Sequence, residues 1–282
     1  MNICLISQNA SPGLTIFRKD FIRYLIDQGH QVYAFAIDYT VVSREIVSEF
    51  GAIPMDYSLN KSRLNIFADL NDTWLLSKQL KKIQPDIVFS FFIKPSVYGT
   101  LAAKLAKVPR RIAMLEGAGY MYTPSKNKLS FKKIILQYAH GLLISIGYAF
   151  ADKVLFLNPD DPVDLTKKSF INSKKFKVIG PIGLELSSYP YTEVVITKPI
   201  RFIFIARILA EKGIYEYLAA AQIVKLKYPD TEFVILGGLD SDNPSALSKE
   251  QLTLAISEGL VSYLGHVSNV SEWLAKSHVF VL

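Results

Sequence analysis

Residues 202–213 read FIFIARILAEKG, an apolar run that stops at Arg207 and is soon followed by Lys212 and Gly213. A run that is apolar throughout, without alternation, is typical of a strand in a parallel sheet that is covered on both faces. The loop after such a strand lines a ligand crevice, and the next helix attracts anions at its N-terminus. Arg207 gripping two oxygens and Lys212 acting as a point charge would then form a diphosphate clamp. The alternative is a pair of cations solvated in an ordinary loop.

The same alternation of strand and helix extends through the chain on both sides of this stretch. We predict strands at 2–7, 30–37, 52–57, 86–92, 110–117, 153–158, 200–206, 232–238, 261–265 and 278–282. We predict helices at 14–28, 41–50, 67–84, 95–108, 213–228, 245–259 and 268–277. This order indicates an α/β protein with parallel sheets covered by helices.

The domain organisation follows from length and from two prolines. A chain of 282 residues is long enough for about two domains. Pro190 and Pro199 mark residues 189–199 as a linker between tandem Rossmann-like domains at 1–188 and 200–282. Ligands of such domains bind in the cleft between the carboxyl ends of the strands. Because the run at 278–282 has no turn after it, we expect the second domain to be incomplete and the chain to be part of a longer protein.

The composition limits the classes of binding partner and the cellular compartment that we expect for this protein. The net charge of +7 and the pI of about 9.2 favour an anionic partner: nucleic acid, an anionic membrane or a phosphorylated substrate. The basic residues are spread out and not interleaved with aromatic ones, which argues against nucleic acid. The single cysteine, Cys4, lies in the first apolar run and is expected to be a core thiol, which fits a cytosolic setting. The first ten residues do not resemble a signal peptide.

Residues 126–153 raise the question of a membrane. Lysines precede the apolar part of this segment at four positions: Lys126, Lys128, Lys132 and Lys133. Residues 134–151 contain no Asp, Glu, Lys or Arg, and their length is near the lower limit for a spanning helix. Gln137, His140 and a strand directly after the segment favour a buried core helix instead. A basic segment resting on an anionic bilayer is the third interpretation, and it is compatible with the second.

Two other motifs imitate ligand sites. The sequence DSD at 240–242 resembles a metal-binding Asp-x-Asp, but it lies in a polar loop, and Arg207 and Lys212 already supply positive charge there. We therefore expect no metal. The sequence GAGYMY at 117–122 lacks the third glycine of a dinucleotide fingerprint and follows a late strand.

Several stretches together resemble one enzyme family. ARILAEKG at 206–213 resembles the donor-phosphate motif of the family 4 glycosyltransferases, which have the GT-B fold. FVILGG at 233–238 resembles the next strand and glycine turn of that family, and 261–282 resembles its base-binding strand, loop, helix and following strand. Residues 99–122 resemble the bacterial branch that extends saccharides linked to polyprenyl diphosphate.

The resemblance covers the whole chain and implies a function. It implies a retaining transfer of a sugar, such as N-acetylgalactosamine or another N-acetylhexosamine, from a UDP-sugar to a polyprenyl-diphosphate-linked saccharide. The setting would be O-antigen or capsule synthesis at the cytoplasmic face of the membrane, without a cofactor. The family's pair of donor-binding glutamates lies beyond 278–282, so we expect the parent protein to be the catalyst. A UDP-sugar epimerase of the same fold and a non-catalytic binding partner are the alternatives.

The resemblance also implies roles for the donor side. Arg207 and Lys212 would bind the diphosphate and stabilise the charge of the leaving group. Gly237 and Gly238 would let the backbone approach the donor, unless they only form a tight turn. Gly265 and His266 lie where the family holds the nucleobase, although a single histidine is often an ordinary surface or core residue.

The N-terminal half would supply the remaining contacts. Gly13, in the loop 8–18, is the expected close-approach glycine for the donor, and Arg18 is a candidate contact for an acceptor phosphate or an ordinary surface residue. Glu116 would orient the acceptor hydroxyl or accept its proton, unless it is a salt-bridged or helix-capping residue. Gly117 and Gly119 would face the acceptor.

Overall fold

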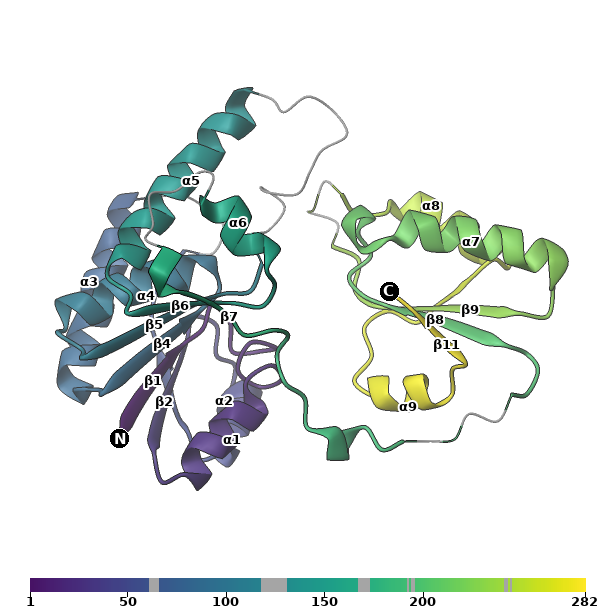
Figure 1. Ribbon diagram of the computed structural model, residues 1–282. Helices are drawn as coiled ribbons and strands as arrows, with labels where there is room; N and C mark the ends of the chain where they lie inside the picture. Colours follow the sequence, from purple (N-terminus) through teal and green to yellow (C-terminus); the bar gives the residue numbers. More distant parts are fainter. Residues whose placement is uncertain are drawn as a thin grey trace. The chain divides into compact units, whose positions relative to one another are not determined.

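The chain folds into two compact units, residues 1–184 and 185–282 (Figure 1). The structure is a computed structural model that describes residues 1–60, 66–117, 131–166, 173–191, 193, 196–240, 243 and 245–282. For residues 66, 131–137, 139, 140 and 188 it describes the backbone alone. The predicted α/β class is confirmed in both units, since each is built on a parallel sheet with helices packed against it.

In the described part of the first unit, seven strands form one sheet in the order β3-β2-β1-β4-β5-β6-β7. Every neighbouring pair is parallel. The strands are β1 (Asn2–Ile6), β2 (Gln31–Ala36), β3 (Ile53–Asp56), β4 (Ile87–Phe91), β5 (Arg110–Leu115), β6 (Lys153–Phe156) and β7 (Phe176–Val178). The helices are α1 (Lys19–Asp27), α2 (Val41–Glu49), α3 (Ile66–Ile83), α4 (Ile93–Leu105), α5 (Phe131–Ala149) and α6 (Asp160–Thr166).

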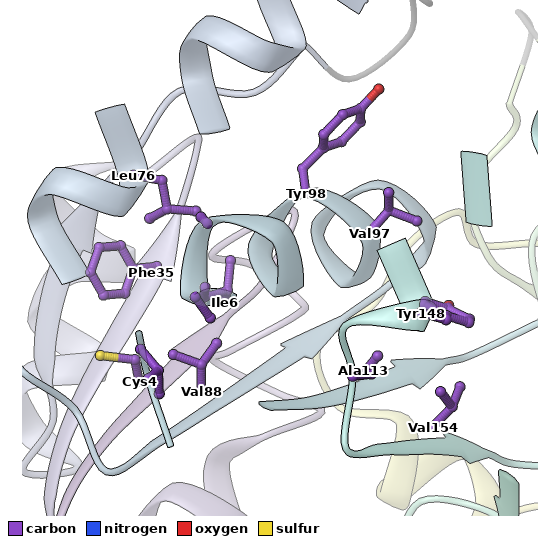
Figure 2. Close-up of a cluster of buried hydrophobic side chains, with 14 of the residues drawn as sticks. Cys4, Ile6, Phe35, Leu76, Val88, Val97, Tyr98, Ala113, Tyr148 and Val154 are labelled. Atoms are coloured by element: carbon purple, nitrogen blue, oxygen red, sulfur yellow. The ribbon is translucent and has the colours of Figure 1, made fainter. Parts of the chain in front are cut away.

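Helices cover both faces of this sheet. Cys4 and Ile6 of β1 belong to the core beneath α3, α4 and α5, which Figure 2 shows, whereas Ile3 and Leu5 belong to the core beneath α1 and α2. This split follows from the alternation of side chains along a strand. Cys4 is fully buried, and burial raises the pKa of its thiol to about 12, so the predicted core thiol is confirmed.

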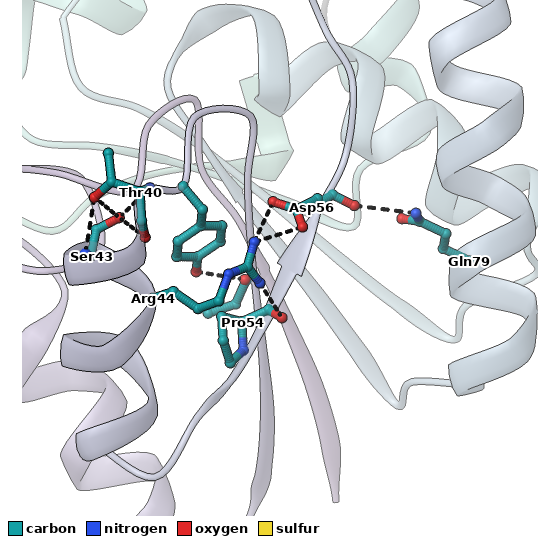
Figure 3. Close-up of polar contacts among 8 residues, drawn as sticks. Thr40, Ser43, Arg44, Pro54, Asp56 and Gln79 are labelled. Carbon is teal, nitrogen blue, oxygen red and sulfur yellow. Dashed lines mark hydrogen bonds and ion pairs between the residues drawn. The ribbon is translucent and has the colours of Figure 1, made fainter.

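Polar contacts fix α2 against the edge of the sheet (Figure 3). Thr40 and Ser43 cap the helix reciprocally, each side chain accepting a hydrogen bond from the other residue's backbone N–H. The Arg44 guanidinium donates to both carboxylate oxygens of Asp56 on β3, at 2.6 and 2.7 Å, and Gln79 of α3 donates to the Asp56 carbonyl. The edge strand is thereby tied to helices on both faces.

Helix α5 contributes to the core of the first unit. Ile144 and Tyr148 are buried, and the Tyr148 hydroxyl lies 2.8 Å from the Ser96 hydroxyl of α4. A Cβ on Gly147 would lie 2.7 Å from a methyl carbon of Val97, so this glycine allows α4 and α5 to pack closely. These contacts support the core-helix interpretation of 134–151. None of the helices in the described regions has the length and apolar character needed to cross a bilayer.

The second unit repeats the architecture on a smaller scale. Its described sheet is parallel with the order β10-β9-β8-β11, formed by β8 (Arg201–Ile205), β9 (Glu232–Leu236), β10 (Ser262–Tyr263) and β11 (Val279–Val281). The helices α7 (Ile214–Lys227), α8 (Lys249–Ser257) and α9 (Val270–Ala275) pack around it. Its larger core lies beneath α7 and α8, and a smaller one lies beneath α9.

The structure differs from the sequence prediction at several helix ends, such as that of α8, which begins at Lys249 and not at 245. Two larger differences lie in the first unit. The first helix begins at Lys19 and not at 14, because residues 11–18 form consecutive turns in which Ala10 and Pro12 accept the backbone hydrogen bonds. Helix α6 and strand β7, neither of which the sequence pattern indicated, follow β6. β7 contains only three residues, and two of them are exposed, which explains the weak signal.

Candidate functional site: two sets of loops at strand ends

The loops after β8 and β9 are joined by backbone hydrogen bonds. The N–H of Ile208 donates to Gly238, and the N–H of Leu247 donates back to Ile208. The N–H of Ala210 donates to Ser245 at 2.8 Å, and Leu209 forms an antiparallel bridge with Ala246. The Arg207–Gly213 loop is therefore held in place by its neighbour, at the sheet edge where parallel strands bind ligands.

Arg207 and Lys212 both lie in this loop with exposed side chains. Arg207 is 62% exposed in its side chain, and its guanidinium donates to Asp240 in the neighbouring loop at 3.2 Å. Lys212 ends a short 3-10 helix (Ala210–Lys212) directly before α7. Gly213 joins the two helices at a φ of 83°, a conformation that favours glycine.

The N-terminus of α7 lacks a side-chain cap. Gly213 occupies the N-cap position and has no side chain to accept a hydrogen bond from the first turn. The free N–H groups and the helix dipole of the 14-residue α7 therefore add positive potential beside Lys212. Cationic side chains and open amides together are the groups that bind phosphate oxygens.

Glu211, which the sequence analysis missed, lies between the two cations. Desolvation acts to raise the pKa of its carboxyl group, but the Ser245 hydroxyl, which donates at 2.5 Å, and a backbone hydrogen bond outweigh it. The charges of Arg207 and Lys212 lower the pKa further, and it lies below the ordinary value. Arg207 and Lys212 therefore share a short loop with a carboxylate on which both charges act.

The predicted site glycines of the second unit differ in how strictly the backbone requires a glycine at each position. Gly237 has a φ of 141°, and a Cβ there would lie 1.8 Å from the Ala206 carbonyl oxygen. A Cβ on Gly238 would meet nothing within 4 Å. Gly265 has a φ of 70° and accepts a hydrogen bond from the N–H of Gly237. His266 follows it with an exposed side chain.

The first unit places Arg18 and Glu116 in one buried ion pair. The side chains are 5% and 8% exposed, although they come from the first βα loop and from the residue after β5. The Arg18 guanidinium also lies 4.2 Å from the centroid of the Phe91 ring and donates to the Phe17 carbonyl. Burial lowers the pKa of Arg18 to about 10, which leaves it charged at neutral pH. The salt-bridged alternative for Glu116 is confirmed, but the sequence did not identify Arg18 as its partner. The alternative of an ordinary surface residue is wrong for Arg18, whose side chain is buried.

Gly13 and Gly117 lie in the loops after β1 and β5, at the same edge of the first sheet as Arg18 and Glu116. A Cβ on Gly13 would lie 2.3 Å from the Asn9 side-chain oxygen and 2.6 Å from the Ser7 hydroxyl, so the close approach is to its own turn. Gly117 follows Glu116 with a φ of 113°. Gly119, Lys126 and Lys128 lie outside the described residues, and the side chains of Lys132 and Lys133 do too.

A metal site needs several acidic, histidine or cysteine side chains close together in the described ranges. No group of three or more His, Cys, Asp or Glu side chains is arranged there to hold a metal ion. Asp240, the first residue of the DSD motif, is paired with Arg207, and Asp242 lies outside the described residues.

Two family models match the chain, one in each unit. Residues 2–158 match the model "Glycosyl transferase 4-like", and residues 199–282 match "Glycosyl transferases group 1". The two models thus agree with the resemblance carried by ARILAEKG and the stretches around it.

Two curated relatives are similar over most of the chain. The N,N'-diacetylbacillosaminyl-diphospho-undecaprenol alpha-1,3-N-acetylgalactosaminyltransferase of Campylobacter jejuni is 30% identical, over 97% of this chain and 72% of its own length. The UDP-Gal:alpha-D-GlcNAc-diphosphoundecaprenol alpha-1,3-galactosyltransferase of Escherichia coli is 25% identical, over 78% of this chain and 57% of its own length. The names of both relatives specify a saccharide linked to diphosphoundecaprenol.

Solved structures give the same fold. Anabaena HepE, in complex with UDP and glucose, superposes with a TM-score of 0.70 at 14% sequence identity. The match covers 99% of this chain and 73% of that one.

Proposed function

Because the chain belongs to the family 4-like, group 1 glycosyltransferases, we propose that it transfers a sugar from a UDP-sugar to a saccharide on polyprenyl diphosphate. The donor sugar would be an N-acetylhexosamine such as N-acetylgalactosamine, and its anomeric configuration would be retained. The relative of this type in Campylobacter jejuni supports the choice of donor sugar and acceptor.

The observation that carries the proposal is the pair of exposed cations beside an uncapped helix. Arg207, Lys212 and the first turn of α7 present positive charge at one loop, which Ser245 and Gly238 hold in place. We assign the donor diphosphate to this loop. In the reaction, the bond between the anomeric carbon and the diphosphate oxygen breaks while the acceptor oxygen bonds to that carbon. The hydroxyl proton leaves with the departing phosphate, whose growing negative charge the two cations stabilise.

We propose that Gly237 and Gly265 shape the backbone of this donor site. Gly237 keeps its loop against Ala206, where no larger residue fits, and Gly265 accepts from Gly237 at the end of β10. We place the donor near Gly238 and the nucleobase near His266, which is exposed next to Gly265. No metal is needed in this scheme, because the cations and the helix supply the positive charge.

In the first unit, the ion pair limits what Glu116 can do. The Arg18 guanidinium already occupies the Glu116 carboxylate and fixes its position. We accordingly assign Glu116 to orienting the acceptor hydroxyl and Arg18 to positioning Glu116. Gly13, Gly117 and Gly119 remain assigned to the backbone around the substrates.

The lipid-linked acceptor implies a location at the inner face of the cytoplasmic membrane. Lys126, Lys128, Lys132 and Lys133 would contact anionic lipid before and at the start of α5. The protein would then be peripheral and would act in O-antigen or capsule synthesis. Nucleic acid is not among the proposed partners.

Transfer of radiolabel to lipid tests the proposal. The protein is incubated with labelled UDP-N-acetylgalactosamine, UDP-N-acetylglucosamine or UDP-galactose and with a polyprenyl-diphosphate saccharide, and the lipid fraction is counted. We expect label in lipid from one N-acetylhexosamine donor. No transfer from any donor would contradict the proposal.

The same reactions separate the alternatives. Interconversion of UDP-sugars without lipid would identify an epimerase. If UDP failed to raise the melting temperature while another protein copurified, a non-catalytic binding partner would be the better description.

A further inference from the structure

Helix α3 carries an exposed stripe that the proposed reaction does not use. Its inner face packs on the first sheet through residues such as Thr73, Leu76 and Leu80. The opposite face, here called the α3 stripe, consists of Phe67, Leu70, Trp74, Lys78, Lys81 and Lys82, all exposed. These positions recur every three or four residues and therefore lie along one side of the helix.

The side chains at the apolar end of the α3 stripe are highly exposed to solvent. Phe67 is 86% exposed, and Leu70 and Trp74 are each 50% exposed. Single exposed apolar residues need no explanation, but three on one helix face form a patch. The patch includes one of the chain's two tryptophans.

The other end of the α3 stripe is basic. Lys78, Lys81 and Lys82 follow the aromatic residues on the same side, and the Lys78 ammonium lies 3.4 Å from the centroid of the Trp74 ring. The stripe itself contains no acidic residue. The two acids of α3 are directed elsewhere, since Asp69 is buried beside Lys94 at 3.0 Å and Asp72 accepts from Ser58.

We propose that the α3 stripe is a docking surface for an anionic bilayer. Aromatic and leucine side chains enter the boundary between headgroups and acyl chains, and nearby lysines bind anionic headgroups. A second copy of the chain fits less well. In either orientation, a copy of the same stripe would place lysines against lysines or against apolar side chains, leaving buried charges without partners.

The α3 stripe lies on a different helix from Lys132 and Lys133, which are in the first turn of α5. Helices α3 and α5 lie on the same face of the first sheet, each packed against α4 (Figure 1). Two contacts on one face would fix how the first unit is oriented on the bilayer. The inference rests on the proposed function only in that a lipid-linked acceptor requires a membrane-bound enzyme.

Vesicle sedimentation tests the docking surface without any sugar substrate. The intact protein is centrifuged with vesicles of phosphatidylcholine alone or with about a third phosphatidylglycerol. We expect binding to the anionic vesicles. We also expect about a tenfold or greater loss of binding in Phe67→Ser/Trp74→Ser and in Lys78→Glu/Lys82→Glu.

Two matched variants control for general effects. Val41→Ser/Val42→Ser removes exposed apolar side chains from α2, on the opposite face of the sheet, and Lys227→Glu/Lys249→Glu makes the same charge change in the second unit. Both should bind like the unchanged protein.

Trp74 supplies a direct reporter. Brominated lipid should quench the tryptophan emission of the unchanged protein, and Trp74→Phe should abolish that quenching, because Trp273 packs on the core of the second sheet. Equal vesicle binding by the α3 variants and the unchanged protein, or no quenching of Trp74, would overturn the proposal. So would a dimer that Phe67→Ser/Trp74→Ser dissociates, combined with no binding to vesicles.

The proposed sugar transfer and the proposed docking surface can be contradicted independently of each other. Transfer of sugar to a short-chain, water-soluble acceptor should survive Phe67→Ser/Trp74→Ser if the α3 stripe only docks the protein. Vesicle binding without transfer would leave the docking surface standing and remove the proposed reaction.

Discussion

At the scale of single residues, the Asp240 carboxylate would compete with the donor diphosphate for the Arg207 guanidinium. The Asp240 carboxylate lies 3.2 Å from the guanidinium that we assign to the diphosphate, and both side chains are partly exposed. A diphosphate bound to Arg207 must replace or share this contact. Asp240 therefore acts as an internal anion at the proposed donor loop.

Replacing this competitor should tighten binding. Because an exposed ion pair contributes at most about 1 kcal/mol, we expect Asp240→Asn to lower the dissociation constant of UDP by up to about fivefold. Titration calorimetry measures the change, with Asp230→Asn on a distant loop as the control. Weaker binding by Asp240→Asn would show that Asp240 assists the donor instead.

We expect the buried ion pair of Arg18 and Glu116 to contribute to the free energy of unfolding. Glu116→Ala leaves a guanidinium charged and buried without its partner, which costs about 3 kcal/mol or more. Urea unfolding followed by circular dichroism measures this loss. Arg18→Met/Glu116→Ala removes both charges and should recover much of it. If the single and double variants unfolded alike, the pair would not be what holds these loops.

The residue scale also marks a limit of sequence reasoning. The local pattern picked out Arg207 and Lys212 as candidates, because a strand end followed by cations is typical of an anion site, whereas the role of Gly237 came from the family resemblance. The donor-binding roles of these residues stay predictions. The partner of Arg18 could not be predicted, since Glu116 is remote in sequence and only the order of β1, β4 and β5 brings the two together. Glu211 was visible between the two cations, but its role depends on Ser245 in another loop.

At the scale of elements, the turn after β9 requires a glycine at position 237. Gly237→Ala would place a methyl group against the Ala206 carbonyl oxygen at a strained φ, so we expect a loss on the order of 3 kcal/mol. The next residue is a matched control, because a Cβ on Gly238 meets nothing and Gly238→Ala should cost less than about 1 kcal/mol. Thermal unfolding of the two variants measures the difference, and equal melting temperatures would contradict this account of the turn.

Elements were predictable where their apolar runs were long. β1, β4 and β8 lie within predicted strands because they are largely apolar, with side chains that are buried or half-buried on both faces. β7 was missed because Lys177 and Val178 are exposed, which leaves Phe176 as its only half-buried residue. α1 begins later than predicted because Leu14 is buried from a turn, so it follows the apolar pattern without being helical.

At the scale of the whole molecule, the two units share one design. Each is a parallel sheet whose described loops at the carboxyl ends carry the predicted site residues, with Arg18 and Glu116 in one and Arg207 and Lys212 in the other. The chain's positive net charge agrees with substrates that carry diphosphates and with an anionic surface. The α3 stripe adds a surface feature that depends on which helix face the fold leaves open.

The most direct test of the central claim is UDP binding by the variant Arg207→Ala/Lys212→Ala. Each charge-assisted contact with a phosphate contributes about 1.5 kcal/mol or more, so losing both should raise the dissociation constant of UDP about 100-fold or more. The matched control Lys227→Ala/Lys249→Ala removes the same charge from exposed helix positions and should bind UDP normally. An unchanged dissociation constant in Arg207→Ala/Lys212→Ala would contradict the account.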